Sequence, residues 1–339
     1  MQTLTIKDIA RMAGVSPTVV SFVINNRKGV SPDTRGKVLR IIEQTGFTPS
    51  ISSRRLIMKK SFNIGIIIEK GFSPFTNLFH FEIAQSLLER SRNYGYNLIF
   101  TDIPKTGPGI QLPGIIENKD TDGVIFLQDT PYLILQEIEN RAIPCVVIDA
   151  HPGSEPYLMV KADYEQAAVV AMEYLVGQNH QDIALITSSY VPNFYTQIFS
   201  GYRRVLAQNG LAIQSGWIQT DATDERTAGA CFDRIVQSGR LPTAVFCATD
   251  LFAVGAMQAA KAHGLKIPGD ISFVGIDDII LSQYVEPALT TVRIDKTQMG
   301  GIAIDMIIQA ISGIRPESVT VRSDQLIVRQ SVLNRKETV

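Results

Sequence analysis

Residues 17–25 carry side chains whose chemistry suits the edges of DNA bases. They are the outward-pointing residues of an expected short helix: Pro17, Thr18, Ser21, Phe22 and Asn25. Hydroxyl and amide groups can hydrogen-bond to base edges in the major groove, and an aromatic ring can contact the methyl group of thymine. This combination predicts a surface that reads a DNA sequence. The pattern alone is also compatible with a small helical hairpin used only for packing.

Two short helices around a tight turn are needed to present these side chains. In the first helix four apolar residues recur with a helical period, namely Ile6, Ile9, Ala10 and Ala13. Thr5 with Asp8 resembles a capping box, and Gly14 suits the left-handed residue after a helix. Ser16 is a good N-cap for the second helix, and Pro17 is favoured at a first helical position. The arrangement predicts a helix-turn-helix, whose second helix enters the major groove.

The charge distribution favours a nucleic-acid partner for the N-terminal part. The 339-residue chain has a net charge of −1, from 32 Lys and Arg against 33 Asp and Glu. Residues 1–60 hold eleven of the basic and three of the acidic residues, a net charge of +8, which leaves −9 for the remainder. A basic module suits phosphate contacts, whereas nucleic acid repels an acidic body. Arg27 and Lys28, in the loop after the second helix, are expected to reach phosphates.

A third helix and a short linker complete this head. A serine–proline start signal recurs at Ser31, and the third helix is expected to run to about Thr45. Residues 49–61 then form a polar, basic linker that is too short for a stable isolated helix. We expect it to be disordered when free and helical on DNA, with Arg54 attracting phosphates. Leu56 would either wedge between base steps in the minor groove or cover the top of the following domain.

The remaining residues alternate short apolar strands with amphipathic helices. Strands are expected at residues 64–68, 98–101, 123–127, 145–149, 183–187, 243–248 and 271–276. Helices are expected near residues 79–94, 131–141, 163–177, 195–210, 224–238, 250–263 and 296–312. This alternation predicts parallel sheets with helices on both faces. Since a break near residue 160 separates two similar halves, the expected fold is a small all-α helix-turn-helix head plus an α/β body of two Rossmann-like lobes.

Several segments of the head form a specific set. They are Thr5-Ile6-Lys7-Asp8-Ile9-Ala10, Ala13-Gly14-Val15-Ser16, Val20-Ser21, Val23-Ile24-Asn25, Val30-Ser31, Thr34-Arg35 and Pro49-Ser50. In these residues the chain resembles the DNA-binding head of the lactose-repressor (LacI/GalR) family of bacterial transcription regulators. Head, linker and body follow one another in the order of that family over nearly the whole chain. The resemblance implies a sequence-specific DNA-binding repressor with a periplasmic-binding-protein-like body.

The resemblance also implies domain boundaries. Residues 1–48 would form the helix-turn-helix domain, 49–61 the hinge, and 62–339 the effector-binding and dimerisation domain. In the family the chain crosses between the lobes near positions that correspond to residues 161, 291 and 320. The first lobe would then comprise about 62–161 and 292–319, and the second about 162–291 and 320–339.

The chain departs from the family where DNA sequence is read. Positions 17, 18 and 22 contact bases in the family and often bear polar or charged side chains, but here they are Pro17, Thr18 and Phe22. In the hinge, Ser50 and Ser53 replace the Asn and the Ala of the family's pattern, whereas Arg54 and Leu56 match that pattern. The operator is therefore expected to differ from those of better-known relatives. The predicted DNA-binding residues are Thr5, Ser16, Pro17, Thr18, Ser21, Phe22, Asn25, Arg27, Arg54 and Leu56.

Residues after the expected strands are candidates for a ligand site, because open α/β sheets bind ligands at the carboxyl ends of their strands. Those residues include Asp149, Asp163, Ser188, Asp250 and Asp277, with Phe79, His80 and Phe194 on adjacent segments. The resemblance implies that Asp277 hydrogen-bonds an effector. The predicted effector-binding residues are Phe79, His80, Asp163, Phe194 and Asp277. Asp163 and Asp250 could instead cap the helices that follow them.

Two further positions bear on the chemistry of the effector. Many family members carry an Arg shortly before the Gly-Tyr pair that matches Gly201-Tyr202, and an aromatic residue further along. This chain has Ile198 and Ala222 at those positions. The pocket could therefore take a less polar ligand than a sugar, or respond to something other than a sugar.

The sequence lacks the residues that other classes of function need. The four histidines, His80, His151, His180 and His263, have no metal-ligand spacing, and no phosphate-binding loop, dinucleotide-binding or hydrolase motif is present. Asp277 and Asp278 are adjacent and should diverge, so capping explains them better than acid–base catalysis. A secreted solute-binding protein would need a signal peptide and would have no use for a basic head. We predict no enzyme activity, no metal and no cofactor.

The cysteines and apolar runs indicate the compartment and the partners. Cys145, Cys231 and Cys247 are widely spaced in apolar surroundings, as in reduced cytosolic proteins. The apolar runs are shorter than a membrane span, so we expect a cytoplasmic protein of the bacterial nucleoid with no membrane partner. The expected partners are a palindromic double-stranded DNA operator, a second copy of the chain in a homodimer, and a small-molecule effector. The effector, a sugar or other small metabolite, would shift the population of lobe arrangements.

Overall fold

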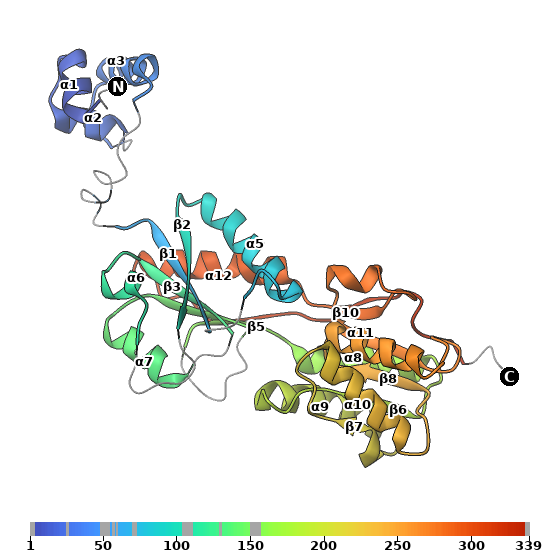
Figure 1. The fold of residues 1–339 in the computed structure, drawn as a ribbon. Coiled ribbons are helices and arrows are strands. Elements are labelled where there is room, and N and C mark those ends of the chain that lie inside the picture. Colours follow the sequence, from blue (N-terminus) through green and yellow to red (C-terminus); the bar gives the residue numbers. More distant parts are fainter. Residues whose placement is uncertain are drawn as a thin grey trace. The chain divides into compact units, whose positions relative to one another are not determined.

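The computed structural model describes residues 4–24, 27–47, 55, 58, 60–69, 73–103, 111–128, 131–149 and 157–335. The chain forms two compact units, residues 1–62 and residues 63–339, called here the head and the body. The order of their helices and strands along the chain can be followed by colour in Figure 1.

Residues 4–24 and 27–47 of the head form a bundle of three helices, α1 (Ile6–Ala13), α2 (Pro17–Ile24) and α3 (Pro32–Thr45). Its core consists of the buried residues Ile9, Ala10, Ala13, Val20, Val23, Val38 and Phe47. Of the periodic apolar positions expected in the first helix, Ile9, Ala10 and Ala13 are buried in this core, and Ile6 packs against it. Leu39 of α3 is exposed and does not join this core.

The expected start and stop signals of these helices are confirmed. Thr5 caps α1 in a capping box with Asp8, and Gly14 ends α1 with φ of 65°. Ser31 accepts a hydrogen bond from the amide of Thr34 at the start of α3, and Gly46 ends α3 with φ of 62°. These local hydrogen bonds satisfy backbone groups that a helix leaves unpaired at its ends, so they fix where each short helix begins and ends.

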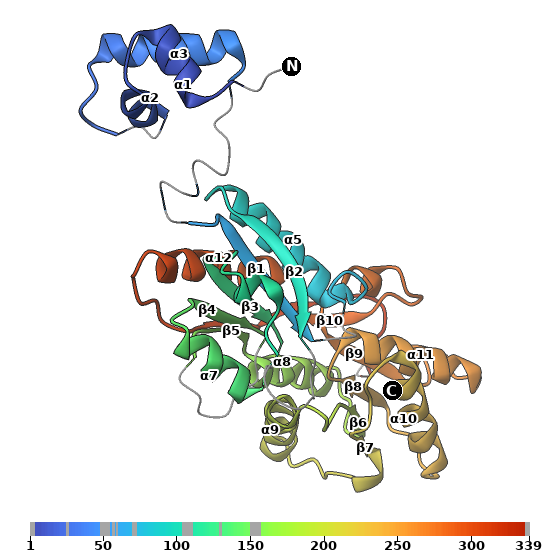
Figure 2. The same cartoon turned by 60° about the vertical axis from the view of Figure 1, so that its left-hand side comes forward.

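The first lobe of the body is built on a parallel six-stranded sheet of order β11-β5-β4-β3-β1-β2. Its strands are β1 (Asn63–Glu69), β2 (Asn97–Ile103), β3 (Gly123–Leu127), β4 (Cys145–Ile148), β5 (Met159–Ala162) and β11 (Val319–Val321). Helices α5 (Leu78–Arg92) and α12 (Lys296–Ile311) pack together on one face. Helices α6 (Gly114–Glu117) and α7 (Tyr132–Asn140) contribute Ile116 and Ile138 to a buried cluster with residues of the strands. Figure 2 shows α7 on the side of the strands away from α5 and α12.

The second lobe has a six-stranded sheet of order β12-β10-β9-β8-β6-β7, in which only β12 is antiparallel to its neighbour. Its strands are β6 (Ile183–Ile186), β7 (Ile218–Gln219), β8 (Ala244–Cys247), β9 (Ser272–Asp277), β10 (Thr290–Arg293) and β12 (Gln325–Ile327). Helices α8 (Tyr164–Gly177) and α9 (Pro192–Gln208) pack as one pair, and α10 (Glu225–Gln237) and α11 (Asp250–Ala262) as another. The short 3-10 helices η1 (Ser215–Trp217) and η2 (Ile280–Gln283) complete the lobe. The predicted fold class is thus confirmed.

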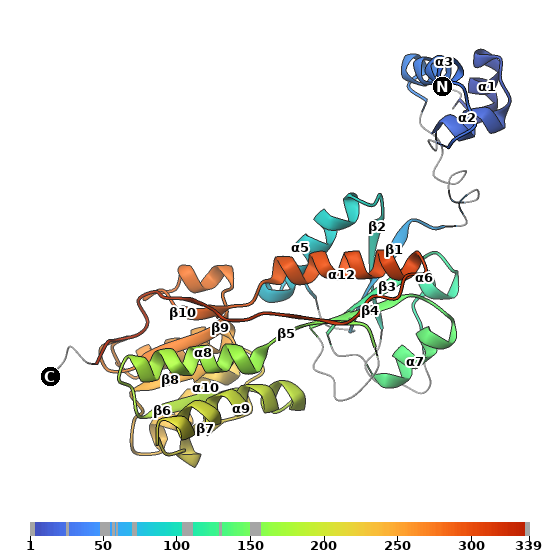
Figure 3. The ribbon, with the colours of Figure 1, turned by 180° about the vertical axis from the view of Figure 1, so that it is seen from behind.

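The chain passes between the two lobes three times: after β5, after β10 and after β11. Two of these crossings touch, because the amide of Asp163 donates to the hydroxyl of Ser323 at 3.3 Å. Figure 3 shows β5 and the C-terminal crossing running side by side. β5 ends at Ala162, β10 at Arg293 and β11 at Val321, and the chain crosses after each of them.

Candidate nucleic-acid interface and ligand pocket

The exposed face of α2 carries most of the side chains expected to read DNA. Pro17 and Thr18 are exposed, whereas Ser21 and Phe22 are half-buried. The guanidinium carbon of Arg27 lies 5.9 Å from the centre of the Phe22 ring, within the range of a cation–π contact. The aromatic ring is therefore held at the surface by a neighbouring cation.

Residues around α2 carry positive charge at the surface and hydrogen-bond to the backbone of the loop that follows α2. Arg27 and Lys28 are exposed in that loop, and Ser16, just before α2, accepts a hydrogen bond from the amide of Val19 at 3.3 Å. Arg35 on α3 donates to the main-chain carbonyls of Val23 and Arg27, at 3.3 and 2.5 Å. Three other predicted DNA-binding residues, Asn25, Arg54 and Leu56, lie outside the described residues.

A cavity of about 700 Å³ lies between the two lobes of the body. The first lobe contributes residues from the start of α5 and the end of β4, and the second contributes residues that follow β5, β6, β7, β8 and β9. Its lining includes Asn77, Phe79, His80, Asp149, Tyr164, Ser188, Tyr190, Phe194, Thr223, Glu225, Phe252 and Asp277. Apolar rings and carboxylates thus face one another across the lobe boundary.

Asp149 and Asp277 occupy matching positions in the two lobes. Asp149 follows β4 and Asp277 ends β9, and they are 9% and 6% exposed. Both have positive backbone φ angles, 55° and 120° respectively. Such conformations cost a non-glycine residue of order 1–3 kcal/mol and are found mainly at functional sites. Burial and the charge of Asp250 raise the pKa of Asp277, although Lys296 opposes this shift.

Asp149 is held by side chains from both lobes. The hydroxyl of Tyr164 donates to its Oδ1 at 3.0 Å, and Nε2 of His80 lies 3.2 Å from its Oδ2. The other ring nitrogen of His80 is 3.1 Å from Oδ1 of Asn77, the N-cap of α5. Burial, with the charge of Asp149, raises the pKa of Tyr164 well above its usual range, so Tyr164 stays a hydrogen-bond donor.

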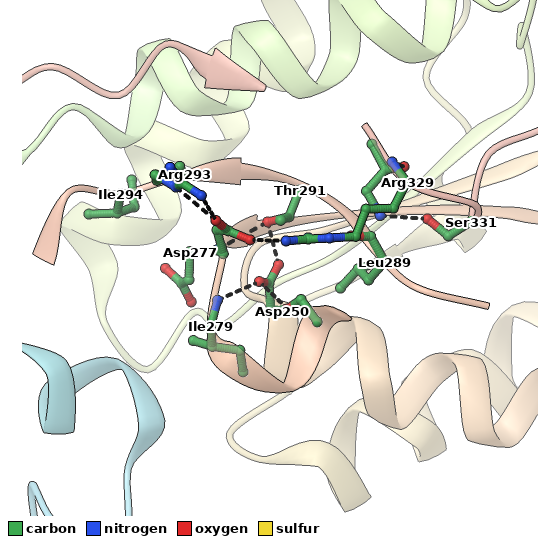
Figure 4. Close-up of polar contacts among 12 residues, drawn as sticks. Asp250, Asp277, Ile279, Leu289, Thr291, Arg293, Ile294, Arg329 and Ser331 are labelled. Atoms are coloured by element: carbon green, nitrogen blue, oxygen red, sulfur yellow. Dashed lines mark hydrogen bonds and ion pairs between the residues drawn. The ribbon is translucent and has the colours of Figure 1, made fainter. Parts of the chain in front are cut away.

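Asp250 lies fully buried next to Asp277 and is the centre of a hydrogen-bond network (Figure 4). Its carboxylate accepts from the hydroxyls of Ser282 and Thr291, both at 2.5 Å, and from the amide of Ile279 at 3.1 Å. Gly275 makes the space, because a Cβ at that position would collide with Oδ1 of Asp250. Burial raises the pKa of Asp250 to about 7, against the lowering effect of the two hydroxyls.

The capping role considered for Asp250 is therefore wrong. Thr249 is the N-cap of α11 and accepts a hydrogen bond from the amide of Phe252. Capping is also wrong for Asp278, which instead binds Arg293 at 2.7 Å and Arg329 at 2.6 Å. Burial of Asp278 opposes ionisation, but the hydrogen bonds from the two arginines prevail and lower its pKa. The two arginines, labelled in Figure 4, come from different segments: Arg293 ends β10, and Arg329 follows β12.

Four of the five predicted effector-binding residues line the cavity, namely Phe79, His80, Phe194 and Asp277. Asp163 is placed differently: its carboxylate caps α8 by accepting from the amide of Gln166, at the crossing between the lobes. Asp149 and Ser188, named as candidates because each follows an expected strand, also line the cavity, although neither was among the five predicted effector-binding residues; Tyr164 was not predicted.

Ile198 and Ala222, which replace family side chains, are fully buried, and neither lines the cavity. All three cysteines are free thiols. Across the described residues, no group of three or more His, Cys, Asp or Glu is arranged to hold a metal ion. Within that same part of the chain, none of the helices is long and apolar enough to cross a membrane.

Comparison with known proteins identifies the two units of the chain. Residues 5–50 match the model of bacterial regulatory proteins of the lacI family, and residues 172–332 match a periplasmic binding protein-like domain. Over 335 residues the chain is 31% identical to the HTH-type transcriptional repressor PurR of Vibrio campbellii, covering 97% of this chain and 98% of that one. The chain belongs to the lacI family of bacterial regulatory proteins.

Further relatives agree with this assignment. Catabolite control protein A of Priestia megaterium is 30% identical over 307 residues, covering 90% of this chain and 91% of that one. The fold is similar to that of the Lac repressor dimer bound to operator and the anti-inducer ONPF, with a TM-score of 0.77 at 23% identity, covering 98% of this chain and 100% of that one. The lacI-family chain described here is accordingly a DNA-binding transcriptional regulator.

Proposed function

We propose that this regulator is a repressor that binds a palindromic operator as a homodimer and responds to a small molecule in the interlobe cavity. The observation that carries the proposal is the pair Asp149 and Asp277, one from each lobe, at the wall of one cavity. A ligand that contacts both residues contacts both lobes, so it binds one lobe arrangement better than another. Differential affinity of this kind is what shifts a conformational equilibrium.

The chemistry of the cavity favours an uncharged or cationic effector with hydroxyl or amine groups and an apolar face. Asp277 can accept a hydrogen bond when ionised and donate one when protonated, so hydroxyl groups suit it in either state. Phe79, Phe194 and Phe252 offer rings against which a sugar or a base can pack. An anionic compound would meet the carboxylates of Asp149 and Asp277, and no Arg or Lys occurs among the described residues of the lining.

The head supports the proposed operator contacts. Its net charge of +8 attracts the phosphate backbone, while Thr18, Ser21 and Phe22 stand on the face of α2 that reads bases. A two-fold dimer presents two such helices to two half-sites, which makes the operator palindromic. A repressor of chromosomal genes acts in the bacterial cytoplasm, and this role requires neither catalysis nor a cofactor.

A second copy of the chain is the proposed partner of an exposed apolar surface on the body. Phe81 and Leu88 lie seven residues apart on α5 and are 45% and 43% exposed, while Ile280 and Tyr284 are 50% and 75% exposed. Phe81 and Ile280 both line a smaller cavity of about 580 Å³, so the two segments are neighbours. Apolar side chains that gather in this way mark association surfaces. The Lac repressor of similar fold is a dimer.

The test begins with selection of DNA from a random pool by the purified full-length protein. The selected sequence should be palindromic, and its affinity should change in the presence of one of three neutral probes: ribose, cellobiose or adenosine. We expect a change of ~5–150-fold, the usual range of allosteric coupling. Citrate and glucose 6-phosphate are the anionic controls. Selection of no sequence, or of a sequence without two-fold symmetry, would contradict the proposal.

A further inference from the structure

Lys296 is a buried lysine at the second crossing between the lobes. It is the first residue of α12 and is only 3% exposed. Burying a lysine is costly unless its charge is paired or hydrogen-bonded, because its ammonium group loses water. The partners of Lys296 therefore show what its burial achieves.

In the second lobe, Nζ of Lys296 donates to main-chain carbonyls. The distances are 2.5 Å to the oxygen of Asp277 and 3.3 Å to that of Asp278, while the oxygen of Ile294 lies at 3.4 Å. The ammonium thus holds the end of β9, where the chain adopts its left-handed conformation at Asp277. The side chain of Asp277 also lines the effector cavity.

In the first lobe, Lys296 faces α5. Its Nζ lies 3.5 Å from a carboxylate oxygen of Glu82 and 5.8 Å from the centre of the Phe79 ring. Phe79 lines the effector cavity, and Glu82 follows Phe81 of the proposed dimer surface. Because α12 itself packs on α5, the backbone of Lys296 belongs to the first lobe while its closest partners belong to the second.

We propose that Lys296 is a positioning residue that couples the effector cavity to α5 by dividing its ammonium group between the Asp277 carbonyl and the Glu82 carboxylate. The inference rests on the proposed function, since it assumes that an effector occupies the cavity. Rotation of one lobe against the other changes the distance from Nζ to the Asp277 carbonyl, but it leaves Glu82 and α12 together on the first lobe. The ammonium group of Lys296 then divides differently between the Asp277 carbonyl and the Glu82 carboxylate in each lobe arrangement, so the two arrangements differ in their contacts.

The test measures operator affinity of the full chain with and without the neutral probe that acts on the wild type. In Lys296→Met the change in affinity caused by that probe should fall by ~10-fold or more, whereas Lys296→Arg should keep it within ~3-fold. Glu82→Gln leaves the Asp277 contact intact, so binding of the probe should stay within ~3-fold while its effect on operator affinity changes. Lys261→Met is the matched control, because exposed Lys261 also donates to a main-chain carbonyl, that of Glu286, but lies outside the cavity.

The outcomes separate this inference from the function on which it rests. If Lys296→Met binds operator and responds to the probe as the wild type does, Lys296 has no coupling role and the inference is wrong. A lowered melting temperature with an unchanged response also overturns it, since that result indicates a purely structural lysine. If no probe changes operator affinity of the wild type, the proposed effector control fails first, and the coupling role fails with it.

Discussion

Asp149 directly follows β4 and Asp277 ends β9, the corresponding strand of the other lobe, and both reach the same cavity from left-handed backbone conformations. Their surroundings differ. Tyr164 and His80 surround the carboxylate of Asp149, whereas Asp277 lies beside buried Asp250 and is held through its carbonyl by Lys296. One aspartate is thus fixed by side chains and the other by its backbone. The carboxyl group of Asp277 accepts a hydrogen bond from the backbone of Asp250, and its side chain lines the cavity.

Phe22 should make the operator sensitive to thymine methyl groups. Replacing a contacted thymine by uracil in the selected operator removes one methyl group, worth about 0.8 kcal/mol or roughly fourfold in affinity. The wild type should show this loss in fluorescence anisotropy, and Phe22→Ala should bind both operators equally. If uracil substitution at every thymine has the same effect on Phe22→Ala as on the wild type, the ring does not read the methyl group.

Two adjacent glycines of α12 should respond in opposite directions to alanine. A Cβ at Gly300 would lie 2.8 Å from Cβ of Ser86 and 2.9 Å from the carbonyl oxygen of Ile83 on α5. Apart from the backbone of its own helix and its chain neighbours, one at Gly301 would have no atom of the described residues within 4 Å. Gly300→Ala should therefore destabilise the body by about 1–3 kcal/mol through overpacking. Gly301→Ala should stabilise it by about 0.5–1 kcal/mol, because alanine favours the helix. Urea unfolding of both variants checks the pair, and equal effects would mean that α12 and α5 do not pack this closely.

His180 should make the body less stable in mild acid. Its ring is buried between Thr243 and the carbonyl of Leu333, and burial lowers its pKa to about 4 although that carbonyl opposes the shift. Between pH 6.5 and pH 4 the unfolded chain therefore binds a proton that the folded chain does not, so the free energy of unfolding falls as the pH falls. By pH 5 the loss should be roughly 1–2 kcal/mol.

The measurement compares the free energy of unfolding at pH 7.5 and pH 5 in the wild type and in His180→Gln. The variant should lose less stability between the two pH values, by the amount attributed to His180. His263→Gln, at an exposed histidine beside Asp233, is the matched control for replacing a histidine by glutamine. A His180→Gln variant as sensitive to acid as the wild type would refute the assignment.

Much of the fold follows from local sequence patterns. Helix capping acts within one helical turn, so the boundaries of α1 and α3 could be predicted from their caps, Thr5, Gly14, Ser31 and Gly46. The central strands and long helices of the body were predicted within a few residues, because apolar runs and helical periods mark them. The short strands β5, β7, β10, β11 and β12 were missed, since two to four residues carry no periodicity and depend on neighbours far along the chain.

The candidate site was predictable only in part. Asp277 follows an apolar run, so its place at the edge of a sheet could be inferred. The role of Asp250 could not, because Ser282 and Thr291 reach it from positions more than 30 residues along the chain, and the space at Gly275 is tertiary. For the same reason the sequence does not distinguish an aspartate that caps a helix from one that centres a buried hydrogen-bond network. The contact of Lys296 with the end of β9 has no signal in the sequence either, because it depends on how α12 and β9 are placed together.

The central claim, effector control through the interlobe cavity, is tested most directly by Asp277→Asn. Operator affinity is measured with and without the neutral probe that acts on the wild type, with Asp233→Asn on α10 as an exposed control outside the cavity. We expect Asp277→Asn to remain dimeric, to bind operator within ~3-fold of wild type, and to lose ~10-fold or more of the change that the probe causes. A variant that answers the probe like the wild type would contradict the claim.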